Sequence, residues 1–141
     1  MTAIILKPGR ERAVLGRHPW IFSGAEARLE GEAGSGETVE VLSSNGEWLA
    51  RAAYSPHSKI RARIWTWDQE CAVDAQFLER RIQQAAKRRE AWLDSLRTSA
   101  FRLVFAEADN LPGIIVDRYQ STLVVQFLSA GVEFHREQIL D

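Results

Sequence analysis

The stretch ETVEVLSSNGEWLARAAYSPHSKIRARIWTW, residues 37–67, decides the fold of the first half of the chain. Apolar and polar residues alternate over 37–42, which is typical of a strand with one buried face. Asn45-Gly46 is a strong β-hairpin signal, and it joins this strand to a second one over 48–54. A third strand follows over 59–67. Short strands at such close spacing predict a small β-barrel.

The residues before this stretch predict further short elements of the same barrel. An apolar run at 3–6 predicts a strand that ends at Lys7-Pro8-Gly9. One or two helical turns are expected over 10–16, and a short strand over 20–22. The glycine-rich segment 31–36 is followed by a strand. A phosphate-cradling loop needs a helix there instead, so the segment indicates a turn.

The second half has the pattern of a long helix followed by a sheet. Apolar residues recur at spacings of three and four over 73–96, which predicts an amphipathic helix. Its polar face is basic, with Arg80, Arg81, Lys87, Arg88 and Arg89. Three strands are predicted after the helix, over 101–106, 113–117 and 122–128. A helical pattern resumes at Val132.

These patterns together predict an α+β fold in two domains, 1–70 and 71–141. The chain stops at Asp141 inside a helical pattern, and the strand 122–128 is apolar on both faces. We therefore expect the second domain to be a truncated one. An uncovered apolar strand invites pairing with another copy, so self-association through residues 101–141 is expected, by strand pairing or exchange of the terminal helix.

Composition limits the classes of function. The net charge is −1 with 18 Lys+Arg and 19 Asp+Glu, so any nucleic-acid binding must come from a local basic patch. A single cysteine, Cys71, cannot form an intramolecular disulfide, which fits a reducing compartment. No signal peptide is recognised at the N-terminus. No run of about 18 apolar residues predicts a membrane span, so a cytoplasmic location is expected.

The sequence offers no convincing catalytic or metal-binding group. Cys71 has acidic neighbours, which disfavour the thiolate that a nucleophile needs, so a linker or packing role is favoured. The histidines 18, 57 and 135 lie far apart and lack metal-ligand spacing. Carboxylates are plentiful, but none forms a recognisable acid–base pair. We therefore expect no catalytic, cofactor-binding or metal-binding residue in this chain.

Two basic and aromatic clusters favour RNA binding instead. Alternation along 59–67 places Arg61, Arg63, Trp65 and Trp67 on one face. Arginines bind phosphates and aromatic rings stack on bases. The alternative is that the tryptophans pack against the second half and the arginines pair with acids. The second cluster consists of Lys7, Arg10, Arg12, Arg17 and His18. We select Lys7, Arg10, Arg17, His18, Arg61, Arg63 and Trp65 as candidate RNA-binding residues.

Several stretches resemble bacterial cytosine-5 methyltransferases of large-subunit ribosomal RNA. Those similar to the N-terminus of that family are Lys7–Glu11, His18–Ala25, Ala50–Pro56 and Ile60–Thr66; those similar to its middle domain are Glu107–Gly113 and Val116–Tyr119. Their order and spacing cover nearly the whole chain.

The resemblance implies an N-terminal PUA domain, which is a small RNA-binding pseudo-barrel, and part of an α/β middle domain. It also implies that a Rossmann-like domain binding S-adenosylmethionine, with the catalytic cysteine, is absent here. The chain would then position 23S ribosomal RNA for a reaction carried out elsewhere in the parent protein, and would itself be inactive. The alternative is a free-standing PUA-type module that binds RNA or protein with no enzyme attached.

Overall fold

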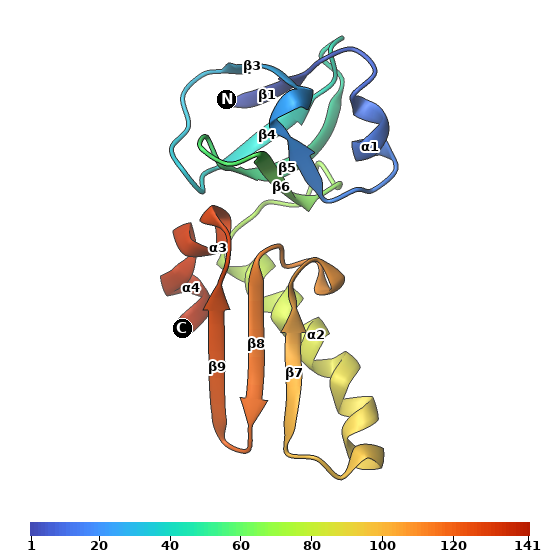
Figure 1. Ribbon diagram of the computed structural model, residues 1–141, viewed down its shortest axis with the longest axis vertical. Helices are drawn as coiled ribbons and strands as arrows, with labels where there is room; N and C mark the ends of the chain where they lie inside the picture. The colour runs from blue at the N-terminus through green and yellow to red at the C-terminus, as the bar shows by residue number, and fades with distance from the viewer. The chain divides into compact units, whose positions relative to one another are not determined.

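The computed structural model describes the backbone of residues 1–141 and every side chain except those of Asp94 and Leu96. The chain forms two compact units, Met1–Val73 and Asp74–Asp141, which are coloured blue to green and green to red in Figure 1. Each unit contains its own sheet, and the predicted α+β class is confirmed. No helix among the described residues is both long and apolar enough to cross a bilayer.

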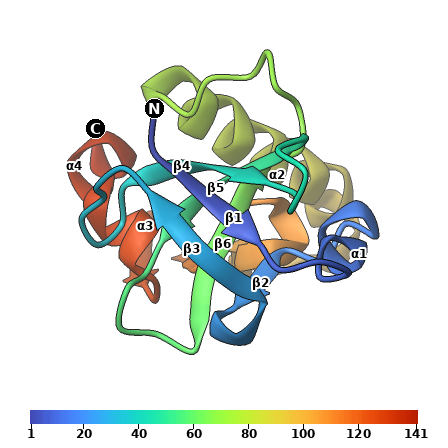
Figure 2. The same cartoon turned by 90° about the horizontal axis from the view of Figure 1, so that it is seen from above.

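A curled six-stranded sheet forms the first unit (Figure 2). Its strands are β1 (Ala3–Leu6), β2 (Trp20–Phe22), β3 (Glu26–Glu30), β4 (Thr38–Leu42), β5 (Trp48–Tyr54) and β6 (Ile60–Thr66). The short helix α1 (Glu11–Leu15) and the 3-10 turn η1 (Ser23–Ala25) connect β1, β2 and β3. The strand order is β2-β6-β5-β4-β1-β3, and β1 is parallel to β4 whereas the other neighbours are antiparallel.

The core of the first unit lies inside this curled sheet. The alternation in β4 buries Val39 and Val41, as predicted, and α1 contributes Val14. The cluster also includes Ile4, Leu6, Ile21, Leu49, Ala50, Ala52, Tyr54, Ala62 and Ile64. Each large apolar side chain buried in this way contributes about 1.5–3 kcal/mol to folding. Because Val14 of α1 and Ile21 of β2 belong to this core, the surface segment that joins α1 to β2 is fixed at both ends.

Strand β3 has no counterpart among the predicted strands. Its sequence EARLE is mostly polar, and of its residues only Leu29 packs against the core. The strand forms because its backbone pairs along β1 from Glu30 to Glu26. A polar edge strand of this kind carries almost no hydrophobic pattern, so only the partner strand reveals it.

Strand β6 contains a β-bulge. Arg51 pairs with Thr66 while the next residue, Ala52, pairs with Ile64, so Trp65 is the extra residue on β6. A bulge of this type locally shifts the alternation of side chains by one position.

The bulge changes the position of Trp67. Its ring packs against the core, and its Nε1 donates a hydrogen bond to the Val14 carbonyl at 2.8 Å. The prediction that Trp67 shares a face with Arg61 and Arg63 is therefore wrong. The alternation rule fails here because one inserted residue reverses the orientation of everything that follows it.

The second unit consists of a long helix, a three-stranded antiparallel sheet and two short helices. The elements are α2 (Ala75–Leu96), β7 (Ala100–Phe105), η2 (Ala106–Asp109), β8 (Ile114–Tyr119), β9 (Thr122–Phe127), α3 (Ala130–Phe134) and α4 (Arg136–Leu140). The strand order is β7-β8-β9. Helix α2 begins after Asp74, whose Oδ1 accepts a hydrogen bond from the Phe77 amide at 2.8 Å. Figure 1 shows α2 running along the β7 side of the sheet.

Candidate nucleic-acid interface

The segment between β1 and β2 gathers exposed basic side chains. We call Lys7, Arg10, Arg12, Arg17 and His18 the basic corner; all five side chains are exposed. The chain turns at Gly9, whose φ of +80° favours glycine, and the Arg10 amide donates to the Lys7 carbonyl at 3.0 Å. Among the side chains that the structure describes, none forms an ion pair with a member of the basic corner. These charges therefore face solvent uncompensated.

Two cations of the basic corner are held in place by the fold. Lys7 Nζ donates a hydrogen bond to the Gly24 carbonyl at 3.0 Å. The guanidinium carbon of Arg17 lies 5.3 Å from the centre of the Trp67 ring, which is a cation–π distance. Because Trp67 is itself hydrogen-bonded to Val14, the position of the Arg17 charge depends on the core. Exposed cations that are already ordered lose less side-chain entropy when they bind an anion.

The rings of Trp20 and Phe22 lie next to His18 of the basic corner. The ring centres of His18 and Trp20 are 6.1 Å apart, those of His18 and Phe22 are 6.2 Å apart, and those of Trp20 and Phe22 are 6.3 Å apart. The Trp20 amide donates to Nδ1 of His18 at 3.2 Å. Phe22 is 49% exposed although it is large and apolar. Exposed aromatic rings beside cations are the combination that single-stranded nucleic acids require.

The residues predicted on β6 occupy different environments. Arg63 is half-buried, and the antiparallel register of β2 and β6 places it directly opposite Trp20. Arg61 Nε lies 2.8 Å from the Glu26 carboxylate, and its guanidinium also donates to the Pro56 carbonyl. Trp65 is 1% exposed. The two predicted clusters thus meet at the β2–β6 pair, but the basic corner supplies the exposed charges.

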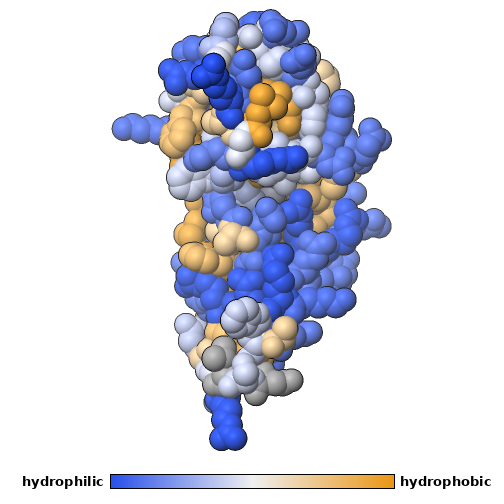
Figure 3. Space-filling model, turned by 90° about the vertical axis from the view of Figure 1, so that its right-hand side faces the viewer, coloured by the Kyte–Doolittle hydropathy of each residue, from blue (hydrophilic) through white to orange (hydrophobic). Residues whose placement is uncertain are grey.

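Figure 3 views the side of the first unit on which α1 lies in Figure 1. Its surface there is mostly hydrophilic and is interrupted by small hydrophobic patches. Leu15 of α1 is 64% exposed and Phe22 of β2 is 49% exposed. A small apolar patch surrounded by charge is suited to a ligand with both ring faces and phosphates.

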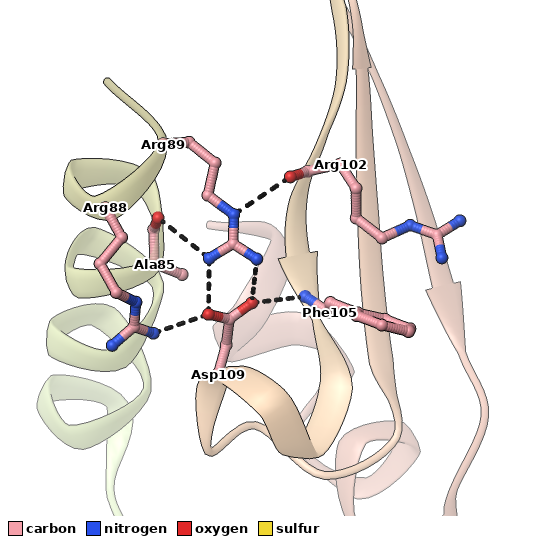
Figure 4. Close-up of polar contacts among 6 residues, drawn as sticks. All are labelled: Ala85, Arg88, Arg89, Arg102, Phe105 and Asp109. Carbon is pink, nitrogen blue, oxygen red and sulfur yellow. Dashed lines mark hydrogen bonds and ion pairs between the residues drawn. The ribbon is translucent and has the colours of Figure 1, made fainter. Parts of the chain in front are cut away.

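The arginines of α2 serve a different purpose from the basic corner (Figure 4). Asp109 is 3% exposed, and its Oδ1 accepts hydrogen bonds from Arg88 at 2.7 Å and from Arg89 at 2.5 Å. Its Oδ2 accepts from Arg89 at 2.7 Å and from the Phe105 amide at 2.7 Å. The Arg89 guanidinium also donates to the carbonyls of Ala85 and Arg102. This carboxylate has its hydrogen-bonding positions filled.

The electrostatics of Asp109 follow from these contacts. Burial opposes its ionisation, but hydrogen bonds from Arg89, the Phe105 amide and Arg88 outweigh burial and hold the pKa of Asp109 below its usual value. Asp109 therefore remains ionised and ties the η2 turn to α2. The predicted basic face of α2 is in part a structural ion-pair network, while Arg80 and Lys87 stay exposed.

The described residues contain no group of three or more His, Cys, Asp or Glu side chains that could hold a metal ion. Cys71 is half-exposed in the segment after β6, and its thiol lies 3.8 Å from the Ala72 carbonyl. The glycine-rich residues 31–36 form the loop between β3 and β4, as predicted, and a strand follows them. The local structure that binds a nucleotide phosphate at a helix N-terminus is therefore not formed by these residues.

The first unit matches a known domain family, and known proteins resemble nearly the whole chain. Residues 4–67 match the model of the PUA-like domain family. The chain is 54% identical over 140 residues to the ribosomal RNA large subunit methyltransferase I of Yersinia pseudotuberculosis and of Yersinia pestis. That match covers 97% of this chain and 35% of each relative, so the chain spans about a third of the length of these relatives.

Solved structures show the same fold over nearly the whole chain. A SAM-dependent methyltransferase from Streptococcus mutans superposes with a TM-score of 0.84 and 17% identity. A methyltransferase complexed with SAH superposes with a TM-score of 0.85 and 17% identity. In each case the match covers 99% of this chain and 36% of the other. The resemblance to ribosomal RNA methyltransferases that the sequence motifs predicted is confirmed.

Proposed function

The chain carries a PUA-like domain at residues 4–67, and from this premise we propose that it is the RNA-recognition portion of an S-adenosylmethionine-dependent methyltransferase acting on 23S ribosomal RNA. The supporting observation is the basic corner, whose exposed cations lie beside the rings of His18, Trp20 and Phe22 within that domain. We further propose that the base modified by the parent protein is a cytosine, methylated at C5, and that the protein acts in the cytoplasm.

The basic corner binds RNA mainly through phosphates. Lys7, Arg10 and Arg17 are exposed cations on one connection between strands, so a single backbone can contact all three. Phosphate contacts release counterions and supply most of the affinity, with a strong dependence on salt. His18 is exposed and its ring centre lies 6.1 Å from that of Trp20, so it can donate to a phosphate or stack on a base.

Arg61, Arg63 and Trp65 have a supporting role in this proposal. Arg61 would have to give up Glu26 to bind a phosphate, and Trp65 is buried. Arg63 stands opposite Trp20 and borders the aromatic rings. We therefore assign direct RNA contact first to Lys7, Arg10, Arg17 and His18, and assign the β6 residues to the support of that surface.

The residues present do not fit a binding site for S-adenosylmethionine. The glycine-rich loop 31–36 leads into β4 and not into a helix, and Cys71 lies in an acidic segment. We therefore place the cofactor and the methyl transfer in the part of the parent protein that this chain does not match, and expect the chain alone to be inactive.

The test is a binding titration of the 141-residue chain with fragments of 23S ribosomal RNA and with an unrelated RNA of the same length. Binding should be salt-sensitive, with a linear fall of log affinity against log salt. One or a few ribosomal fragments should bind more tightly than the unrelated RNA. Failure to bind any RNA at low salt would contradict the proposal and favour a protein-binding module.

A further inference from the structure

The first unit contains a small cavity beside the basic corner. Its volume is about 170 Å³, and it lies between α1, β2 and the η1 turn. Its inner wall is formed by buried side chains, among them Leu6, Val14 and Ile21. Trp20 and Phe22 line it from β2. Arg10 is the charged side chain of its lining, and it belongs to the basic corner.

We propose that this cavity receives one pyrimidine base turned out of an RNA strand whose phosphates lie on the basic corner. The inference rests on the proposed function and names the part of the RNA that this surface recognises. An apolar cavity of about 150 Å³ is known to hold a single six-membered ring. The cavity therefore suits the one ring of a pyrimidine, whereas a purine has a second ring.

Charge complementarity favours RNA over an apolar protein segment. The lining is apolar except for Arg10, and Lys7 is held at the margin by its hydrogen bond to the carbonyl of Gly24, which also lines the cavity. Both cations are exposed. A ligand that fills this place should thus be a flat ring attached to an anionic chain, which is the chemistry of a nucleotide.

Aromatic side chains at the cavity can provide the recognition energy. Trp20 and Phe22 meet edge to face, with an interplanar angle of 83°, so an inserted ring can lie against the face of one of them. Stacking of one base on an aromatic side chain changes affinity by about 5- to 150-fold. An unpaired base is also needed, because a base within a duplex is already stacked and costs energy to extract.

Gly24 offers a way to close the cavity without disturbing the barrel. A Cβ built on Gly24 meets no atom within 4 Å, and the backbone there does not need positive φ. The variant Gly24→Leu should therefore fold normally, and because Gly24 lines the cavity, the added side chain should reduce the space for a base. Phe22→Ala removes the exposed ring instead, and Trp92→Ala in α2 is the control for loss of an exposed aromatic side chain, since Trp92 is 67% exposed.

The test uses short fluorescent RNA strands in which every position is abasic except the central one. The central position carries uracil, adenine or no base, so all strands have the same charge. Uracil should raise affinity about 5- to 150-fold over the fully abasic strand, and adenine should raise it less. Gly24→Leu and Phe22→Ala should abolish the uracil increment, whereas Trp92→Ala should change neither that increment nor the affinity for the abasic strand.

The outcomes separate this proposal from the proposed function. Binding of the abasic strand without any gain from uracil, or a gain that survives Gly24→Leu, would overturn the base pocket and leave RNA binding intact. Failure of the wild-type chain to bind any of the strands or any ribosomal fragment would contradict the proposed function itself. Tighter binding of an acidic tryptophan-containing peptide than of the uracil strand, abolished by Gly24→Leu, would overturn the assignment to RNA in favour of a protein.

Discussion

The basic corner of the first unit and the η2 turn of the second unit both concentrate arginine, but they differ in what the charges contact. In the basic corner, Arg10 and Arg17 are exposed, and no ion pair to a carboxylate forms among the described side chains. At the η2 turn, Arg88 and Arg89 bind the buried carboxylate of Asp109.

The difference shows why arginine content alone does not identify a nucleic-acid surface. A cation whose hydrogen bonds are already satisfied by a buried carboxylate can bind a phosphate only by breaking that contact, whereas an exposed one exchanges only water and counterions. The comparison therefore predicts that substitutions in the two regions affect different properties: stability at the η2 turn and RNA affinity in the basic corner.

The largest expected effect is that of Asp109→Ala on stability. The substitution removes the acceptor for Arg88, Arg89 and the Phe105 amide, and leaves the mostly buried Arg89 side chain without a carboxylate partner. Loss of one partner from such a network should lower the free energy of unfolding by about 3 kcal/mol. Urea denaturation measures the loss. The RNA affinity of the folded variant should be unchanged. The control is Arg80→Ala, which removes an exposed arginine of α2. An equal loss of stability in this control would contradict the special role of the buried Asp109 contacts.

Gly113→Ala, in the connection between η2 and β8, should lower the free energy of unfolding by about 2 kcal/mol. Gly113 has φ of +86°, and a Cβ there would collide with the side chain of Ser129. The Gly113 carbonyl also accepts from the Leu128 amide at 2.7 Å, which leaves little room to move. Thermal unfolding tests this. Gly46→Ala is the matched control, because Gly46 has φ of +84° but open space around it. This control should lower the free energy of unfolding by less than Gly113→Ala does.

Reversing two charges of the basic corner should weaken RNA binding. The double variant Arg10→Glu/Arg17→Glu removes two phosphate contacts, so affinity should fall at least about tenfold and the salt slope should drop by about 1.4–1.8 units. The control is Arg80→Glu/Lys87→Glu on α2, which makes the same change in net charge at exposed positions of the other unit. Equal losses in both variants would mean that binding depends on total charge and not on the basic corner.

The predicted β6 contacts are tested by Arg61→Glu/Arg63→Glu. Since Arg61 is paired with Glu26, this variant should lose barrel stability as well as RNA affinity, unlike the basic-corner variant. If this variant keeps both its stability and its affinity for RNA, neither Arg61 nor Arg63 belongs to the RNA interface.

The dependence of stability on pH should distinguish Asp109 from exposed acids. Because the folded pKa of Asp109 lies below its unfolded value of about 4, its contribution is complete above that pH and is lost as the pH falls through the folded pKa. Asp109→Asn should therefore flatten the fall in unfolding free energy between about pH 5 and pH 3. Urea denaturation at both pH values measures it, and an unchanged slope would contradict the assigned role.

The smallest expected effect concerns association between copies. Strand β9 lies at one edge of its sheet, and Leu123 and Val124 are 55% and 44% exposed. We propose that residues 101–141 associate weakly through this edge, because unpaired strand backbone with apolar side chains favours pairing. Sedimentation over a range of concentrations should detect it, and Leu123→Lys/Val124→Lys should abolish it. A wild-type chain that stays monomeric at high concentration would rule this out.

Local patterns predicted most of the elements because their signals are local. The hairpin at Asn45-Gly46, the helix α2 and the three strands after it follow from turn chemistry and apolar spacing within a few residues. The sequence patterns did not predict strand β3 or the bulge at Trp65, and both features depend on pairing with another strand. The basic corner was recognisable as a cluster. The alternative that the β6 arginines pair with acids holds for Arg61, but only the fold identifies Glu26 as its partner and shows that Trp65 is buried.

The sequence by itself determined the α+β class, the order of the elements and the cluster of cations between β1 and β2, because periodicity and turn residues act over short distances. Only the tertiary structure decided which charges are available. Asp109 meets arginines about twenty residues earlier in the chain, and Arg61 of β6 meets Glu26 of β3. The tertiary structure also places Leu6, Trp20 and Phe22 around one cavity. Contacts of this kind depend on long-range packing, and the same residue type can be exposed or neutralised according to what the fold places beside it.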